Sequence, residues 1–236
     1  MKCVIPISGG IDSTVMLYKA AKSGDYDDIF AITFFYNQRH AKKEIDAAYS
    51  VVEKLQEQVS CNIFHEMIDL SFFSSVASTS SITNMNIDVA KTKDVLGDPQ
   101  TVNYVPFRNM MMLSILCSYA ESNQAQHVYY GSALVDSQAG YWDGSQEFYN
   151  VLGKLVHLNR KNKIDIITPL LKLEKEQIIA TGYSNNVDFS QTWTCYEGEE
   201  LACGYCTACS SRIKGFMDNK KQDPIPYSRI IDWPSL

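Results

Sequence analysis

The chain reads CVIPISGGIDST from Cys3 to Thr14 and continues with VMLYKAA from Val15 to Ala21. The first part begins with a short apolar run, and the segment after Thr14 has apolar side chains at helical spacing. This order predicts a buried strand, a polar turn with two glycines, and a helix. Because amides at a helix start are unpaired and positively polarised, the turn has the geometry of a phosphate-binding loop.

The turn predicts a site for nucleotide phosphates, with a magnesium ion beside them. Two glycines let the backbone approach a ligand closely, and the hydroxyl groups can donate to phosphate oxygens. Asp12 would repel phosphate unless it helps to hold a metal ion, so we expect Mg²⁺ there. The alternative is an ordinary capped strand–helix turn. The predicted nucleotide-binding residues are Ser8, Gly9, Gly10, Ile11, Asp12, Ser13, Thr14 and Asp136.

The composition indicates a globular protein. A chain of 236 residues with 45% hydrophobic content buries a sizeable core, and its net charge of −6 argues against direct nucleic-acid binding. No apolar run reaches the roughly 18 residues of a membrane span, and the glycine turn interrupts any signal-peptide pattern. We therefore expect a cytoplasmic protein without a membrane partner.

Strand and helix patterns alternate along the chain, which predicts an α/β fold with a doubly wound parallel sheet. After the first strand and helix, we expect strands at 30–36, 61–68 and 127–131, and helices at 42–58, 108–121, 147–159 and 173–182. The polar residues that follow the strands should meet at one edge of the sheet. We divide the chain into a nucleotide-binding domain (1–185), a small helical zinc-binding segment (186–222) and a tail (223–236).

Four cysteines lie close together near the C-terminus: Cys195, Cys203, Cys206 and Cys209. Four thiolates suit a closed tetrahedral Zn²⁺ site, which helps to fold a segment too short for a core of its own. An iron–sulfur cluster also accepts four thiolates, and buried or redox-active thiols are the remaining alternative.

These motifs together resemble the 7-cyano-7-deazaguanine synthase family, QueC-like members of the ATP pyrophosphatase (PP-loop) superfamily. The resemblance implies an adenine nucleotide alpha hydrolase-like fold, a homodimer, and a ligase that adenylates the carboxylate of 7-carboxy-7-deazaguanine. Ammonia then gives the amide, and a second ATP gives the nitrile. The matching segments are Ser8–Ser13, Phe35–His40, Val105–Asn109, Gly131–Asp136, Gly140–Tyr141, Asp143, Thr168–Leu170, Lys175, Thr194–Tyr196 and Cys203–Arg212.

The candidate catalytic residues are Asp12 and the cations Arg39, Arg108 and Lys175. Adenylation develops charge at the α-phosphate, so it needs cations and oriented amides. Each cation could instead be a solvated surface charge, and Lys175 could pair along a helix surface. His40 is either a general base or a packing residue.

Two segments depart from the family pattern. The family's Val-Pro-Gly-Arg-Asn becomes Val-Pro-Phe-Arg-Asn, with Phe107 either stacking in the pocket or packing in the core. The family's Tyr-Pro-Asp-Cys-Arg becomes Tyr-Trp-Asp-Gly-Ser at 141–145, and the arginine is lost. Three alternatives stay open: a divergent relative that couples the adenylated carboxylate to another amine such as a protein or peptide, a tRNA-modifying PP-loop enzyme, and a non-catalytic nucleotide-binding subunit.

Overall fold

A five-stranded parallel sheet forms the centre of the molecule, in the order β3-β2-β1-β4-β5. The computed structural model describes residues 1–91, 101–134, 141–159 and 161–234. The strands are β1 (Lys2–Pro6), β2 (Asp28–Phe35), β3 (Asn62–Asp69), β4 (His127–Tyr129) and β5 (Asp165–Ile167). The parallel order confirms the predicted α/β fold class.

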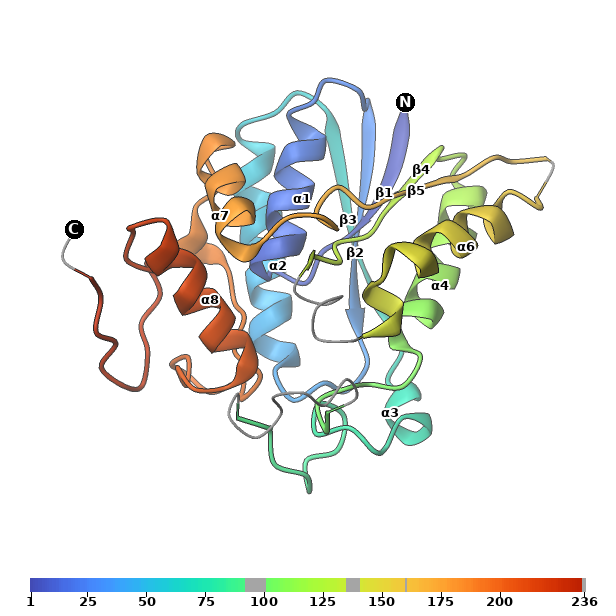
Figure 1. The fold of residues 1–236 in the computed structure, drawn as a ribbon. Helices are drawn as coiled ribbons and strands as arrows, with labels where there is room; N and C mark the ends of the chain where they lie inside the picture. The colour runs from blue at the N-terminus through green and yellow to red at the C-terminus, as the bar shows by residue number, and fades with distance from the viewer. Residues whose placement is uncertain (92–100, 135–140, 160, 235–236) are drawn as a thin grey trace.

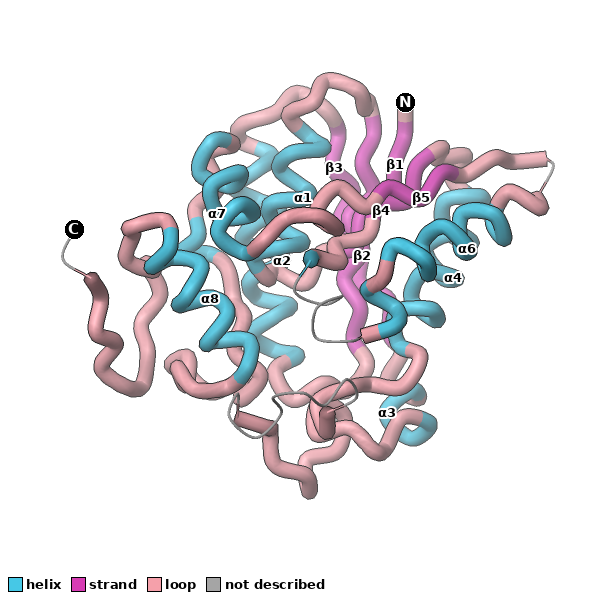
Figure 2. Tube along the Cα trace, in the orientation of Figure 1, coloured by secondary structure: helices cyan, strands magenta, loops and turns pink. Residues whose placement is uncertain are grey.

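Helices cover both faces of the sheet (Figures 1 and 2). On one face lie α1, α2 and α7, and on the other lie α4 and α6. The helices are α1 (Ile11–Ala21), α2 (Ala41–Gln56), α3 (Phe73–Val76), α4 (Arg108–Ser122), α6 (Gln146–Val156), α7 (Lys175–Ser184) and α8 (Thr207–Asp218), with short 3-10 helices η2 (Trp142–Gly144) and η3 (Phe189–Gln191).

The middle strand β1 is buried on both sides because its side chains alternate between two cores. Cys3 and Ile5 belong to the core beneath α1 and α7. Val4 belongs to the opposite core, together with Leu113 and Leu116 of α4. This double coverage explains why the opening strand is a continuous apolar run without polar alternation.

The predicted elements agree with the structure except at short strands and element ends. The strand β5 is not predicted, since three residues are too few to establish a period. β4 ends at Tyr129, two residues before the predicted end. α7 begins at Lys175 because Glu174 caps it, with reciprocal hydrogen bonds to Gln177.

The C-terminal segment packs on the sheet domain through α8. Phe216 of α8 is fully buried in the same core as α1 and α7, and its ring meets Phe189 edge to face. The helical segment therefore shares its core with the nucleotide-binding domain. Within the described residues, every helix is too short or too polar to cross a membrane.

Candidate active site

The glycine turn between β1 and α1 is held in one conformation by its own hydroxyl groups. The Oγ atoms of Ser8 and Ser13 lie 3.1 Å apart, and the Ser13 Oγ accepts from the Ser8 amide at 3.2 Å. Gly10 precedes the helix without a capping side chain, so the first amides of α1 remain available to a ligand. Fixed amides at a helix start form a ready anion site.

Two residues of the predicted loop, Gly9 and Thr14, do not line the cavity described below. Gly9 has a φ of +72°, and a Cβ there would lie 2.6 Å from the Cβ of Ala47 and from the Ala48 amide nitrogen. Only glycine therefore lets the loop lie against α2. Thr14 is completely buried behind the loop, whereas the predicted residues at the cavity surface are Ser8, Gly10, Ile11, Asp12 and Ser13.

A cavity of about 350 Å³ opens beside this loop at the carboxyl ends of the strands. One part of its wall consists of the loop and Lys175. Another part is aromatic and contains five tyrosines, namely Tyr36, Tyr104, Tyr130, Tyr141 and Tyr196. The cavity therefore combines an anion-binding end with flat surfaces that suit a planar ring.

Lys175 and Asp12 face each other across the anion-binding end. The Nζ of Lys175 lies 2.6 and 2.7 Å from the two carboxylate oxygens of Asp12. Lys175 is placed by the start of α7, and a Cβ on Gly215 of α8 would lie 2.7 Å from its Cγ. The ammonium is thus held beside the glycine loop by contacts with α1 and α8, and the catalytic role of Lys175 stays a prediction.

Arg108 brings a second predicted cation to the cavity. Its Nε and Nη2 both donate to Asn109 Oδ1 at 3.1 Å, and its Nη1 donates to the Tyr36 hydroxyl at 3.3 Å. It is the first residue of α4 and lies beside the tyrosine wall. A permanently charged guanidinium is therefore fixed next to the aromatic part of the site.

Two carboxylates also line the cavity. Burial raises the pKa of Glu44, but His40 and a hydrogen bond from Gln38 outweigh burial and lower that pKa below its usual value. The His40 Nε2 lies 3.4 Å from Glu44 Oε1, and Gln38 Nε2 donates to Oε2 at 3.0 Å. Asp143 is only 3% exposed; burial raises its pKa, and Arg108 opposes the shift.

The structure separates the predicted cation Arg39 from this cavity. The Arg39 guanidinium donates to the carbonyls of Ser81 and Ile87 at 3.3 and 2.8 Å and so holds the loop that they belong to. Within the described residues, Arg39 does not line the cavity, and its catalytic role stays a prediction that this geometry does not support. Asp136 lies outside the described residues.

Phe107 lies at the rim of the cavity, in neither of the two predicted environments. It precedes α4 in the left-handed conformation with φ +54°, and its side chain is 60% exposed. The ring packs against Trp142 at a centroid distance of 5.2 Å. Phe107 and Trp142 line a second groove that shares Tyr104 with the cavity.

The four clustered cysteines form a compact thiol site. Their Sγ atoms all lie within 4.8 Å of one another, and all four residues are buried. Backbone amides of Cys203, Cys206 and Cys209 point at cysteine sulfurs at 3.3 to 3.4 Å. Sulfurs that accept amide hydrogen bonds are suited to the thiolate state that binds metal. The geometry therefore fits a tetrahedral metal ion with four protein ligands.

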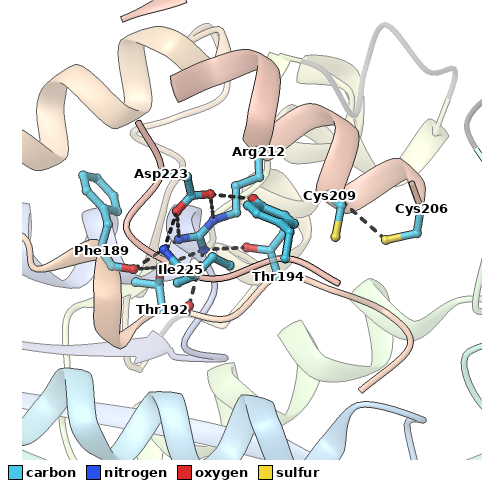
Figure 3. A network of polar contacts seen from close by, with 9 residues as sticks. Phe189, Thr192, Thr194, Cys206, Cys209, Arg212, Asp223 and Ile225 are labelled. Carbon is cyan, nitrogen blue, oxygen red and sulfur yellow. Dashed lines mark hydrogen bonds and ion pairs between the residues drawn. The ribbon is translucent and has the colours of Figure 1, made fainter. Parts of the chain in front are cut away.

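A buried ion pair joins α8 to the wall of the cavity (Figure 3). Arg212 is 1% exposed and donates to Asp223 through Nε and Nη2 at 2.6 and 2.8 Å. Its Nη1 donates to the hydroxyls of Thr192 and Thr194 at 2.8 and 3.2 Å. Between these threonines, the Trp193 amide donates to the Gly9 carbonyl at 2.9 Å. Arg212 therefore supports the strip that backs the phosphate loop.

Several wall residues escaped prediction because nothing local indicates them. Glu44 lies in an amphipathic helix among other charges, and Trp193 resembles any apolar residue in a loop. Tyr104 lies in a stretch rich in serine, threonine and asparagine, at 71–104, that has no clear helical or strand period, and Tyr130 lies at a strand end. One signal for the position of these wall residues was available: polar segments that follow parallel strands meet at one edge of the sheet.

Comparison with known proteins shows the family to which the chain belongs. The model of the family described as "Queuosine biosynthesis protein QueC" matches residues 2–220. The chain is 36% identical to 7-cyano-7-deazaguanine synthase 1 of Colwellia psychrerythraea over 226 residues, covering 96% of this chain and 98% of that protein. It is 38% identical to the 7-cyano-7-deazaguanine synthase of Nitratiruptor sp. over 229 residues, covering 96% and 99%.

Solved structures with little sequence similarity share the fold. The U34-tRNA thiolase NcsA from Methanococcus maripaludis, with its [4Fe-4S] cluster, aligns with a TM-score of 0.53 at 17% identity, covering 93% of this chain and 66% of that one. The NMN synthetase from Francisella tularensis aligns with a TM-score of 0.51 at 19% identity, covering 93% of this chain and 77% of that one. With the family model covering nearly all of the sequence, the chain belongs to the queuosine biosynthesis protein QueC family, ligase-type enzymes with a PP-loop nucleotide-binding fold.

Proposed function

We propose that this protein is an ATP-dependent carbon–nitrogen ligase that converts 7-carboxy-7-deazaguanine to 7-cyano-7-deazaguanine, the product in the names of its relatives. The observation that carries the proposal is one cavity that unites a phosphate loop, Lys175 and Arg108 with a wall of tyrosines. A reaction between a nucleotide triphosphate and a planar acid needs both parts in one space.

The reaction we propose begins with adenylation. A carboxylate oxygen of the substrate attacks the α-phosphorus of ATP, the bond to the β-phosphate breaks, and pyrophosphate leaves. The amides at the start of α1 and the ammonium of Lys175 stabilise the charge that develops on the phosphates. Asp12, which Lys175 contacts at 2.6 Å, is the carboxylate suited to hold Mg²⁺. The ion would supply further charge neutralisation at the phosphates.

Two further steps give the nitrile. The nitrogen of ammonia attacks the acyl carbon, a proton is lost, and AMP leaves, which forms the primary amide. The amide oxygen is then adenylated by a second ATP, with loss of pyrophosphate. Loss of the nitrogen-bound protons and of AMP through cleavage of the C–O bond leaves the nitrile. Burial of the cavity walls keeps water from the acyl carbon.

For the thiol site we propose Zn²⁺. Four buried sulfurs with amide donors fit this ion, and a full set of protein ligands leaves no position for a substrate. Its contribution would be structural: it fixes the knuckle between Cys203 and Cys209, which carries the cavity residues Thr207 and Ala208.

The test is incubation with ATP, ammonia and 7-carboxy-7-deazaguanine, followed by mass spectrometry of the base and separate measurement of AMP and pyrophosphate. We expect the nitrile, with two AMP and two pyrophosphate per nitrile. Absence of ATP cleavage with this base, at a concentration that saturates the relatives named above, refutes the proposal.

One observation favours a second product. Phe107 and Trp142 form an apolar rim beside the cavity, in which Phe107 is 60% exposed and Trp142 is half-buried, and Phe107 has a left-handed backbone there. A rim of this kind suits an acceptor larger than ammonia, such as an amine on a peptide or protein, which would end the reaction at a stable amide. The same assay decides: clean formation of nitrile removes this alternative, whereas adenylation without nitrile in saturating ammonia supports it.

A further inference from the structure

Asp143 is an acid whose position the proposed chemistry of ATP does not explain. It lies in the cavity wall with only 3% of its side chain exposed. The phosphate end of the cavity is served by the glycine loop and Lys175, and a carboxylate repels phosphate. Asp143 is therefore placed for the other substrate, the one that carries the planar ring.

The 3-10 helix that carries Asp143 is held firmly. The indole Nε1 of Trp142 donates to the Tyr104 hydroxyl at 2.9 Å, and the Trp142 ring meets Phe148 edge to face. The Ser145 hydroxyl caps α6 by accepting from the Phe148 amide at 3.1 Å. A carboxylate on such a short and pinned segment is pre-organised, which favours recognition over flexible solvation.

The second carboxylate of the cavity is already engaged. Both oxygens of Glu44 have protein partners, Gln38 at 3.0 Å and His40 at 3.4 Å. Arg108 lines the same cavity and opposes the rise in the pKa of Asp143, while its own hydrogen bonds run to Asn109 and Tyr36. Asp143 is thus the better of the two acids for binding a substrate.

The chemistry of the ring identifies what this acid would bind. A 7-deazaguanine presents two adjacent donors, the ring N1–H and the 2-amino group, on the edge of its six-membered ring. Two parallel N–H donors match the two oxygens of one carboxylate. The adenine of ATP has a single exocyclic amino group and no neighbouring N–H, so it lacks this pattern.

We propose that Asp143 is the specificity residue for the base and accepts hydrogen bonds from N1–H and the 2-amino group of a 7-carboxy-7-deazaguanine. The inference rests on the proposed function. The tyrosine wall supplies the stacking surface, Asp143 reads the donor edge, and the carboxylate of the base is left to face the phosphate loop.

The experiment compares 7-carboxy-7-deazaguanine with its analogue that lacks the 2-amino group, using kcat/KM for AMP formation and equilibrium binding of each base. For the wild type we expect a preference of about 10- to 100-fold for the 2-amino compound, from a hydrogen bond to a charged group. Asp143→Asn should reduce the preference to within about threefold. Glu44→Gln should keep the preference even where its rate falls.

The outcomes separate the two proposals. If the wild type cleaves no ATP with either base, the proposed function fails and the role of Asp143 fails with it. If the wild type turns over the 2-amino compound and Asp143→Asn keeps the full preference, only the specificity role is overturned. The specificity role is also overturned if Glu44→Gln, and not Asp143→Asn, loses the preference for the 2-amino compound. If Asp143→Asn is inactive with both bases, the ratio of its equilibrium affinities for the two bases decides whether the preference is lost. Circular dichroism checks that the variant is folded.

Discussion

The substitution Asp223→Asn is expected to destabilise this protein strongly, because it leaves a buried cation without its counter-ion. Asp223 is fully buried and accepts from Arg212, from the Tyr227 hydroxyl at 2.6 Å and from the Ile225 amide at 3.2 Å. Asparagine keeps the shape but removes the charge. Breaking a buried pair from one side costs about 3–5 kcal/mol of unfolding free energy.

This loss should be visible as a fall in Tm of roughly 6–20 °C, since 1 kcal/mol corresponds to about 2–4 °C in a chain of this size. The matched control is Asp218→Asn on α8, the helix that carries Arg212. The partner of Asp218, Lys214, is 76% exposed. An exposed pair adds little, so the control should match the wild type. Thermal unfolding followed by circular dichroism measures both variants.

Asp223→Asn should also weaken nucleotide binding at the active site. Because Arg212 holds Thr192 and Thr194 on either side of the Trp193 amide that contacts Gly9, Asp223→Asn should raise the KM for ATP at temperatures where it is folded. A double variant that replaces both charges by leucine or methionine should recover part of the stability. If Asp223→Asn loses no more stability than the control on α8, the assigned role of the buried pair is wrong.

Three further perturbations have expected outcomes. Phe107→Ala should be less stable to urea than Phe107→Gly by about 1 kcal/mol, because both lose the ring but only alanine keeps the left-handed strain; equal stability contradicts this. Lys175→Met should lower the kcat for AMP formation by at least roughly 100-fold with an unchanged circular dichroism spectrum, whereas the exposed Lys172→Met should not. For the wild type we expect one metal ion per chain by plasma mass spectrometry, and Cys206→Ser should lower both this metal content and the Tm. If Cys206→Ser keeps one ion per chain, the four-sulfur site is refuted.

The sequence allowed accurate prediction where a few neighbouring residues determine the geometry. The phosphate loop follows from an apolar run, two glycines and a helical pattern within Cys3–Ala21, and the structure places the loop as expected. The thiol site follows from the spacing of Cys203, Cys206 and Cys209, since a knuckle brings these sulfurs together by local turns. Both features depend on contacts over a few residues.

Individual contacts could not be predicted where the two partners are distant along the chain. The contact of Lys175 with Asp12 joins residues 163 positions apart, so its spacing on α7 gave no sign of it. Arg39 follows a strand end as a site residue should, yet the path of a long loop offers it the carbonyls of Ser81 and Ile87. A guanidinium takes whichever acceptors surround it, and those acceptors are set by tertiary structure.

The cavity explains why the C-terminal segment cannot be a separate accessory. Trp193 and Thr194 form part of the wall, and Thr207 and Ala208 lie between two cysteines of the thiol site. The glycine loop at the start of the chain therefore shares the cavity with a segment that contacts the thiol site and the Arg212 pair. Since Phe216 fills the same core as α1, we expect a truncation before Cys195 to destabilise the sheet domain and to weaken nucleotide binding.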